Sequence, residues 1–219
     1  MARLVVFGAG NMLSDVVDCA HATGRCVARI VLNAEERVRP RTFGLAERLR
    51  RLAITPDVQR LEAFHPEEDE EYCVGFVDPL RQVLVEDLER RFGIRFCTLV
   101  HPRASVAPAA SLGAGAFVGA GSVIAPGATL GVQVFVNRGV TVGHDTEVGP
   151  YARLMPGCNV GGHVRIGAGA TIGMGANVLQ ELVVGPHAFV AAGALVTRDV
   201  PEAVLAAGVP AVVVKTGLS

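Results

Sequence analysis

Lysine is nearly absent from this chain of 219 residues, because Lys215 is its only lysine although lysine and arginine together number 20. Since Lys215 lies almost at the C-terminus, neither a Schiff-base mechanism nor a phosphate-binding lysine is expected. The net charge of −1 does not favour electrostatic binding of nucleic acid. We therefore expect no nucleic-acid partner.

Cysteine pairs and long apolar runs are also missing. The five cysteines are scattered without a C-x-x-C pair, which argues against a zinc knuckle and against a disulfide framework. No apolar run approaches the ~20 residues of a membrane helix. The opening MARLVVFGAG is interrupted by glycine too soon to be a signal peptide. A cytoplasmic protein without membrane insertion is expected.

The first hundred residues alternate strand-like and helix-like segments. Buried apolar runs predict strands over 3–7, 26–32, 72–77 and 95–100. Apolar residues at helical spacing predict helices over 11–22, around 45–52 and over 79–92, and the stretch 65–71 is expected to be a solvated loop. This alternation predicts a small Rossmann-like α/β domain over residues 1–100.

From residue 101 onward, an aliphatic residue recurs at every sixth position. Sixteen consecutive positions, from Val106 to Val196, are Val, Leu or Ile. A period of six fits neither a helix nor a simple strand, whose periods are about 3.6 and 2. It predicts a solenoid in which each hexad forms one short strand and one turn, and three hexads close a coil. The expected fold is mainly β, with a parallel β-helix over residues 101–219.

His144 and Asp145 stand out in this pattern, two and three places after the aliphatic Val142. An amine or hydroxyl that attacks a thioester must lose a proton, and imidazole is well suited to accept it. A neighbouring carboxylate stabilises the imidazolium as it forms. Both residue types are also common in solvated turns, so the spacing alone leaves a purely structural role open.

Several motifs together resemble those of a known family. They are the turn Gly8-Ala9-Gly10, LVHPRASVAP over 99–108, VNRGVTVGHD over 136–145, and GVPA over 208–211. With the hexads, they resemble the left-handed parallel β-helix acyltransferases, and more narrowly the sialic-acid O-acetyltransferase and UDP-4-amino-sugar N-acetyltransferase group. The resemblance implies a homotrimer that binds acetyl-CoA between adjacent prisms, with active sites built from two chains and no metal.

The resemblance also assigns roles to individual residues. It implies that His144 is the general base of a direct attack on the thioester and that Asp145 raises its basicity. Contacts with acetyl-CoA fall on Gly173 and Met174, and on Arg153. Arg153 stands where the family often has a histidine near the CoA, and two interpretations stay open: it pairs with a CoA phosphate, or it is an ordinary surface residue. Contacts with a sugar or nucleotide-sugar acceptor fall on a turn and a strand end: Gly8, Gly10, Asn11, Met12 and Asn33.

The N-terminal motif departs from the family pattern in two places. The family usually has a histidine after its glycine turn and aspartates at the end of the second strand, whereas this chain has Met12 and Asn33. N-acetylation of an amino sugar is the expected reaction. Two alternatives stay open: O-acetylation of a sugar or another small alcohol, and a non-catalytic trimer that binds a ligand.

Other candidate residues are weaker. The turn at Gly8 begins like a dinucleotide fingerprint, but Leu13 stands where the third glycine belongs, so NAD binding is poorly supported. His163 and His187 do not share a coil position with His144, so we expect ordinary turn histidines and not a three-histidine metal site. Cys158 falls at a small interior position and is a poor candidate nucleophile.

Overall fold

The computed structural model describes residues 2–10, 12–35, 42–78 and 80–218. The chain divides into two compact units, residues 1–97 and 98–219. The fold is mainly β, with a left-handed parallel β-helix after a small Rossmann-like unit, so the predicted fold class is confirmed. Among the described residues, no helix is long and apolar enough to cross a membrane.

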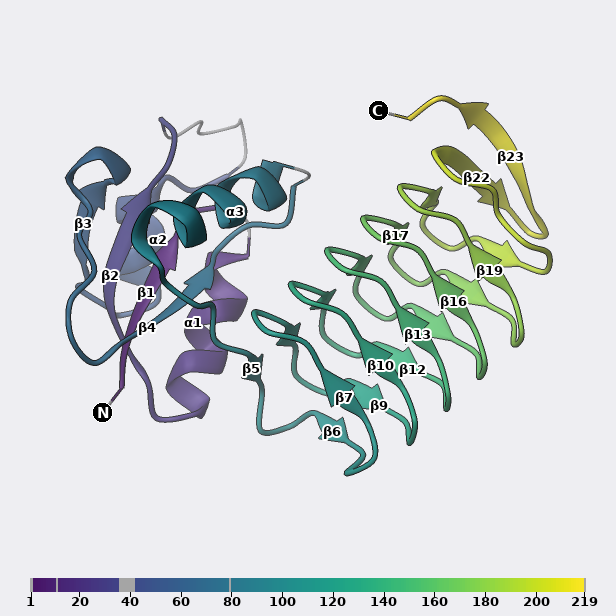
Figure 1. Ribbon diagram of the computed structural model, residues 1–219, viewed down its shortest axis with the longest axis horizontal. Helices are drawn as coiled ribbons and strands as arrows, with labels where there is room; N and C mark the ends of the chain where they lie inside the picture. The colour runs from purple at the N-terminus through teal and green to yellow at the C-terminus, as the bar shows by residue number, and fades with distance from the viewer. Residues whose placement is uncertain (1, 11, 36–41, 79, 219) are drawn as a thin grey trace. The chain divides into compact units, whose positions relative to one another are not determined.

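The N-terminal unit is built on a parallel four-stranded sheet with strand order β3-β2-β1-β4. Its elements are β1 (Arg3–Phe7), α1 (Leu13–Ala22), β2 (Cys26–Leu32), α2 (Leu45–Arg51), β3 (Asp57–Arg60), the 3-10 helix η1 (Leu61–Ala63), β4 (Glu70–Val74) and α3 (Leu80–Phe92) (Figure 1). The central strand β1 is buried from Leu4 to Phe7, as expected for a strand covered on both faces.

Three details of this unit differ from the sequence prediction. β4 begins at Glu70, inside the predicted loop, because the Glu70 carboxylate forms an ion pair with Arg29 of β2 at 2.5 Å. β3 was not predicted, since its sequence DVQR has no apolar run and it pairs only at the sheet edge. The stretch 95–100 is not one strand: Phe96 forms an isolated bridge with Tyr72, and Leu99–Val100 opens the β-helix.

The second unit is a β-helix in which every hexad forms a strand of two residues. These strands are β5 (Leu99–Val100), β6 (Ser105–Val106), β7 (Ser111–Leu112), β8 (Phe117–Val118), β9 (Val123–Ile124), β10 (Thr129–Leu130), β11 (Phe135–Val136), β12 (Thr141–Val142), β13 (Glu147–Val148), β14 (Arg153–Leu154), β15 (Asn159–Val160), β16 (Arg165–Ile166), β17 (Thr171–Ile172), β18 (Asn177–Val178), β19 (Val183–Val184), β20 (Phe189–Val190) and β21 (Leu195–Val196). The antiparallel hairpin β22 (Val204–Gly208) and β23 (Ala211–Thr216) closes the chain.

Away from the ends of the stack, each strand pairs in parallel with the strand one coil before and the strand one coil after it. Val136, for example, lies beside Val118 and Leu154. Together with the closing hairpin β22–β23, the repeat forms three sheets of eight, six and five strands, and the coils stack along one axis (Figure 1). The predicted interior aliphatics are buried from Val118 to Val196, while Val106 and Leu112 are partly buried at the first coil.

Close stacking of the coils explains the glycine that often follows the interior aliphatic. A Cβ on Gly143 would lie 2.4 Å from the backbone of Gly161 in the next coil. Such a contact cannot be relieved by rotating a side chain, so the residue must be glycine. The frame that results is regular, and most side chains at its turns are exposed or half-buried, whereas Gln133 and Asn137 are buried.

Candidate active site

The turn between β12 and β13 presents His144 and Asp145 to solvent. Their side chains are 60% and 55% exposed. Asp145 has a φ of 56°, a left-handed conformation that aspartate adopts more readily than most residues. The turn is anchored by the buried residue Thr146, whose hydroxyl donates to the carbonyl of Gly161 in the next coil at 2.8 Å. Two exposed polar side chains therefore stand on a fixed backbone.

His144 and Asp145 form a direct side-chain contact, in which His144 Nδ1 lies 2.9 Å from Asp145 Oδ2. An ionised carboxylate can only accept a hydrogen bond. Nδ1 must therefore carry the hydrogen of the neutral imidazole, and the lone pair lies on Nε2. This is the tautomer that a general base needs, since Nε2 remains able to accept a proton.

Glycines in the adjacent coils leave room for these two side chains. A Cβ on Gly127, one coil before Asp145, would lie 2.2 Å from Asp145 Oδ1. A Cβ on Gly162, one coil after His144, would lie 2.7 Å from His144 Nε2. Gly162 is the only glycine among the sixteen residues that stand two places after the interior aliphatics. The ring of His144 thus occupies space that a side chain at position 162 would fill.

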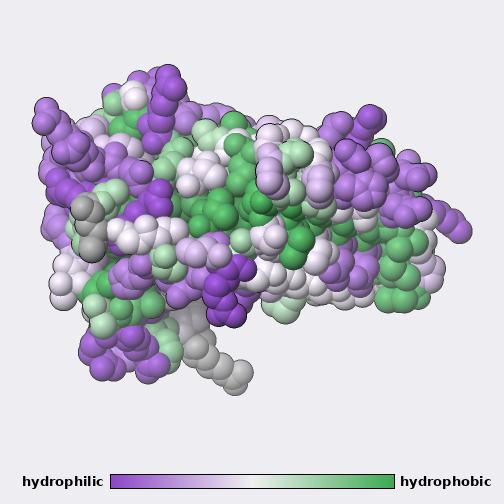
Figure 2. Space-filling model, turned by 90° about the horizontal axis from the view of Figure 1, so that it is seen from below, coloured by the Kyte–Doolittle hydropathy of each residue, from purple (hydrophilic) through white to green (hydrophobic). Residues whose placement is uncertain are grey.

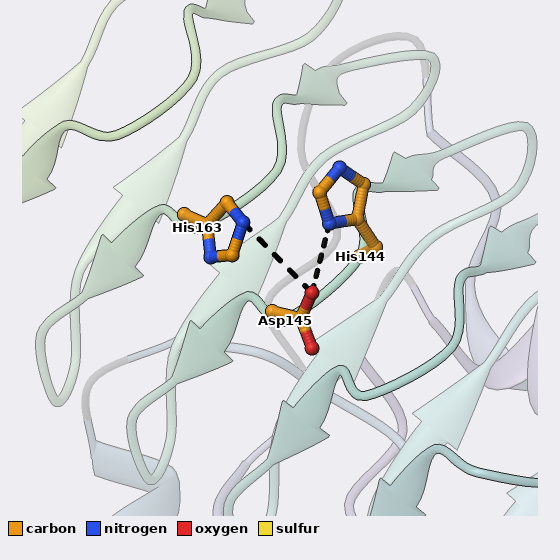
Figure 3. Close-up of side chains that lie close together, drawn as sticks. All are labelled: His144, Asp145 and His163. Carbon is orange, nitrogen blue, oxygen red and sulfur yellow. Dashed lines mark hydrogen bonds and ion pairs between the residues drawn. The ribbon is translucent and has the colours of Figure 1, made fainter.

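His163 completes the cluster from the next coil (Figure 3). Its Nε2 lies 3.9 Å from Asp145 Oδ2, and its ring meets that of His144 edge-on at 4.9 Å between centroids. We expected an ordinary turn histidine here. The overlooked signal is the spacing between residues 145 and 163, which equals three hexads and places His163 directly after Asp145 in the stack.

The same three side chains could hold a metal ion. The ligand atoms of His144, Asp145 and His163 lie within 4.8 Å of one another. Among the described residues, they form the one group of three or more possible metal ligands whose ligand atoms lie this close together. Imidazole nitrogen and carboxylate oxygen suit zinc. A metal bound there would use the imidazole of His144, which could then not act as a base. His187 lies at a different turn, against Gly169.

The residues predicted to contact acetyl-CoA lie on another part of the same β-helix. Arg153 is on β14 and its Nη2 donates to the carbonyl of Gly169 at 3.4 Å. Gly173 and Met174 follow β17, which pairs with β14, and Met174 is 58% exposed. β14 and β17 belong to the eight-stranded sheet, whereas the turn of His144 joins the six-stranded sheet to the five-stranded one. One chain therefore does not bring the two sets together.

An open groove of about 440 Å³ crosses the five-stranded sheet. It is lined by residues of β10, β13, β16 and β19 and of the turns after them. On β13 the lining runs from Glu147 to Gly149, and His144, Asp145 and His163 are not among the lining residues.

Nucleophilic catalysis by cysteine is disfavoured in the β-helix. Cys158 is fully buried, and burial raises the pKa of its thiol to about 12. The thiol stays protonated at neutral pH and has no access to a substrate. This agrees with its predicted place at a small interior position and leaves no acyl-cysteine route at this residue.

In the N-terminal unit, the predicted substrate residues surround the turn after β1. Gly8 has a φ of 79°, and a Cβ on either Gly8 or Gly10 would collide with Phe76. The Asn33 amide oxygen lies near Gly8, at 3.2 Å from the position of such a Cβ. Met12 is only 5% exposed, so a substrate contact through its side chain is at odds with this structure. Asn11 lies outside the described residues.

Arg48 is a residue that the sequence did not reveal. It lies on α2 and donates from Nη1 to the carbonyl of Gly10 at 2.7 Å and from Nη2 to the carbonyl of Ala9. A guanidinium thus stands at the glycine turn, 38 residues away in sequence from Gly10. Its helix was predicted around residues 45–52, but no local pattern connected Arg48 to the turn.

Comparisons with known proteins extend this description. No protein-family model and no curated protein matches the chain. Among solved structures, it is similar to PerB from Caulobacter crescentus in complex with CoA and GDP-perosamine, with 30% identity, 97% of each chain covered and a TM-score of 0.82. A mutant of perosamine N-acetyltransferase from the same organism, with the same two ligands, matches at 29% identity, 97% of each chain and a TM-score of 0.82.

A further similar structure comes from Neisseria gonorrhoeae FA1090. It is the acetyltransferase domain of PglB in complex with acetyl coenzyme A, which is 29% identical to this chain with a TM-score of 0.81. The alignment covers 97% of this chain and 99% of that domain. The similarity therefore includes both compact units and not the repeats alone.

Proposed function

The chain belongs to the hexapeptide-repeat family of sugar N-acetyltransferases, and on that premise we propose that it transfers the acetyl group of acetyl-CoA to an amino group of a nucleotide-linked amino sugar. The similar structures hold CoA, acetyl coenzyme A and GDP-perosamine. The observation that carries the proposal is the contact between His144 Nδ1 and Asp145 Oδ2, because it leaves Nε2 of an exposed imidazole ready to accept a proton.

In the proposed reaction, the acceptor nitrogen attacks the thioester carbon while His144 Nε2 takes the proton that the nitrogen releases. Asp145 stabilises the imidazolium through Nδ1–H. The tetrahedral intermediate then collapses, the C–S bond breaks, and the departing CoA thiolate takes the proton back from Nε2. The products are the N-acetyl sugar and CoA thiol, and His144 is neutral again. No acyl-enzyme forms.

We place the donor and the base on different copies of the chain. Arg153, Gly173 and Met174 lie apart from the His144 turn within one β-helix. Apolar patches interrupt the polar surface (Figure 2), and exposed large apolar residues of the β-helix unit include Val132, Met174, Val183, Phe189 and Val212. Exposed apolar patches of this kind mark surfaces that partners cover. A homotrimer with inter-subunit active sites accounts for both observations.

We assign the N-terminal domain, residues 1–100, to the acceptor and the β-helix domain, residues 101–219, to the acetyl transfer. The glycine turn at Gly8 and Gly10 leads into α1, whose N-terminus favours an anion. Arg48 adds a positive charge at that turn and Asn33 adds an amide. These features suit the phosphates of a nucleotide-sugar. The cytoplasm, where acetyl-CoA is formed and used, is the proposed location.

The proposal is tested by an assay of CoA release with GDP- and UDP-linked amino sugars, their hydroxyl counterparts and free amino sugars. We expect turnover with a nucleotide-linked amine and a loss of about 10²- to 10⁴-fold in kcat for His144→Ala, the range attributed to general-base catalysis. His187→Ala is the matched control and should retain activity.

Two results would contradict the proposal. Turnover that His144→Ala leaves intact would remove His144 as the base. Turnover with the hydroxyl counterparts alone would make the protein an O-acetyltransferase, the alternative that Met12 and Asn33 keep open. The trimer has a separate check, because light scattering should report a mass of three chains of 22.8 kDa.

A further inference from the structure

We infer that His163 is a positioning residue of the proposed acetyl transfer: it holds Asp145 against His144 and keeps the imidazole in the tautomer with its lone pair on Nε2. The inference rests on the proposed function and extends it to a residue of the next coil. Its basis is the cluster of His144, Asp145 and His163, in which one carboxylate oxygen lies between two imidazoles.

The contacts of Asp145 show why it needs a second neighbour. Its side chain is more than half exposed, so water competes for both oxygens, and the hydrogen bond to His144 by itself would leave the carboxylate free to turn away. In the preceding coil, Gly127 has no Cβ, and Oδ1 lies in the space that such a Cβ would need. On the side of the following coil, Nε2 of His163 faces Oδ2 at 3.9 Å. The carboxylate is therefore confined from both sides along the stack.

His163 also limits the movement of the His144 ring. The two rings meet at an interplanar angle of 89°, with centroids 4.9 Å apart. The backbone fixes this approach, because the His163 N–H donates to the carbonyl of His144 at 2.9 Å. A ring turned by 180° would place the carbon Cδ2 where Nδ1 now lies, and the hydrogen bond to Asp145 would be lost. Holding a catalytic group in one orientation in this way raises the rate of the step in which it acts.

The chain supplies a matched comparison for His163. His187 stands at the same place of its hexad and has almost the same backbone, with a φ of 55° against 56°. His187 lies at another turn and is not part of the cluster. A second comparison is Gln133, which also stands at this place in a hexad with a φ of 57°. The chain therefore accepts glutamine in this conformation.

These comparisons define three variants. His163→Gly removes the side chain without opposing the left-handed backbone. His163→Gln replaces the ring by an amide whose nitrogen reaches about as far from Cα as Nε2 does. His187→Gly makes the same change away from the cluster. Thermal unfolding of all three reports whether the β-helix stays intact.

For His163→Gly we expect kcat to fall by about tenfold, the order of loss that follows from misplacing a catalytic group by a fraction of an ångström. The KM values for acetyl-CoA and for the acceptor should stay within about twofold, since the residue acts through Asp145 and not on a substrate. His163→Gln should recover most of the lost kcat. His187→Gly should retain the wild-type kcat.

A readout besides activity separates this inference from the proposed function. Long-range ¹⁵N–¹H spectra of the imidazoles record which nitrogen of His144 carries the hydrogen. We expect the Nδ1–H form in the wild type, a mixture of both forms in His163→Gly, and no change in His187→Gly. If the wild type released no CoA with any acceptor, the proposed function would fail and these spectra would still decide the role of His163.

Three results would overturn the inference. The first is a His163→Gly variant with full kcat. The second is a higher KM for the acceptor at unchanged kcat, which would make His163 a substrate contact. The third is a His144 tautomer that His163→Gly leaves unaltered.

Discussion

The two compact units are stabilised by different kinds of contact. In the β-helix, each residue meets its counterparts one coil away, so the pairing of Val136 with Val118 and Leu154 is repeated along the stack. In the N-terminal unit, single contacts join distant segments, such as Arg29 with Glu70, 41 residues apart. The neighbours of a β-helix residue can be predicted from its position in the repeat. The neighbours of a residue in the N-terminal unit cannot be predicted in this way.

This difference also affects how the stability of each unit responds to a substitution. The core cluster of the β-helix consists of apolar side chains and contains no charged residue. The N-terminal unit buries the ion pair of Arg29 and Glu70, whose side chains are 8% and 0% exposed. Breaking a buried pair strands the remaining charge. The single substitution that most lowers the free energy of unfolding should therefore lie in the N-terminal unit.

The largest effect that we expect on stability comes from Glu70→Ala. The guanidinium of Arg29 would remain buried, although Glu67 at 3.2 Å and the carbonyl of His65 still contact it. A loss of about 3 kcal/mol in the free energy of unfolding follows, at the lower end of the range for broken buried pairs. Hydrogen exchange should locate the loss in β1, β2 and β4 and leave the β-helix protected.

Two control variants sharpen this prediction. Glu71→Ala breaks the more exposed ion pair with Arg25, whose side chains are 24% and 36% exposed, so it should change the free energy by less than about 1 kcal/mol. The double variant Arg29→Met/Glu70→Met removes both charges and should recover most of the loss. Equal destabilisation by Glu70→Ala and Glu71→Ala would contradict the special role of the buried pair.

The same difference sets how much of the structure could be predicted from the sequence. The hexads fixed the interior residues and the turn positions of the β-helix, because the surroundings of each hexad repeat those of its neighbours. β3 escaped prediction, because its residues are mostly exposed and its pairing partner β2 decides its conformation. Arg48 escaped for a similar reason, since its contact with Gly10 depends on how α2 packs.

The candidate site was predicted only in part. His144 and Asp145 were found because they are polar residues at outward positions of an aliphatic repeat. His163 was considered only by its distance of 19 residues from His144, although its distance of 18 from Asp145 is a whole coil. The orientation of the imidazole could not be predicted, since it depends on the space that Gly162 leaves in the next coil.

Gly162→Ala tests the β-helix as a frame for the site and should have an intermediate effect. Alanine is accepted at this hexad position elsewhere, as at Ala114 and Ala168, and Gly162 is not in the left-handed region. The new methyl group would stand 2.7 Å from His144 Nε2 and displace the ring. We expect kcat to fall by at least about tenfold, with the melting temperature nearly unchanged.

Ala114→Ser is the matched control, because it adds one heavy atom at the same hexad position far along the chain from the cluster. It should affect neither kcat nor the melting temperature. A large fall in the melting temperature of Gly162→Ala would instead mean that the glycine serves the packing of the coils and not the ring.

The smallest effect concerns the cysteines, which report on both units in one experiment. All five are free thiols, and only Cys26 is exposed. Alkylation needs the thiolate. Burial raises the pKa of Cys19, of Cys97 and of Cys158, to about 11, about 11 and about 12. A raised pKa keeps these thiols protonated at pH 8, so Cys26 should react first and Cys26→Ser should abolish the fast phase.

The order of the slow reactions then compares the two units directly. Cys73 lies on β4, the strand that carries Glu70, whereas Cys158 lies inside the stacked coils. Buried thiols react only when their surroundings open. Because the β-helix surrounds Cys158 with equivalent coils on both sides, we expect mass spectrometry to find Cys158 modified several-fold more slowly than Cys73. Glu70→Ala should widen that gap by speeding Cys73 alone, and equal acceleration of both thiols would show that the two units open together.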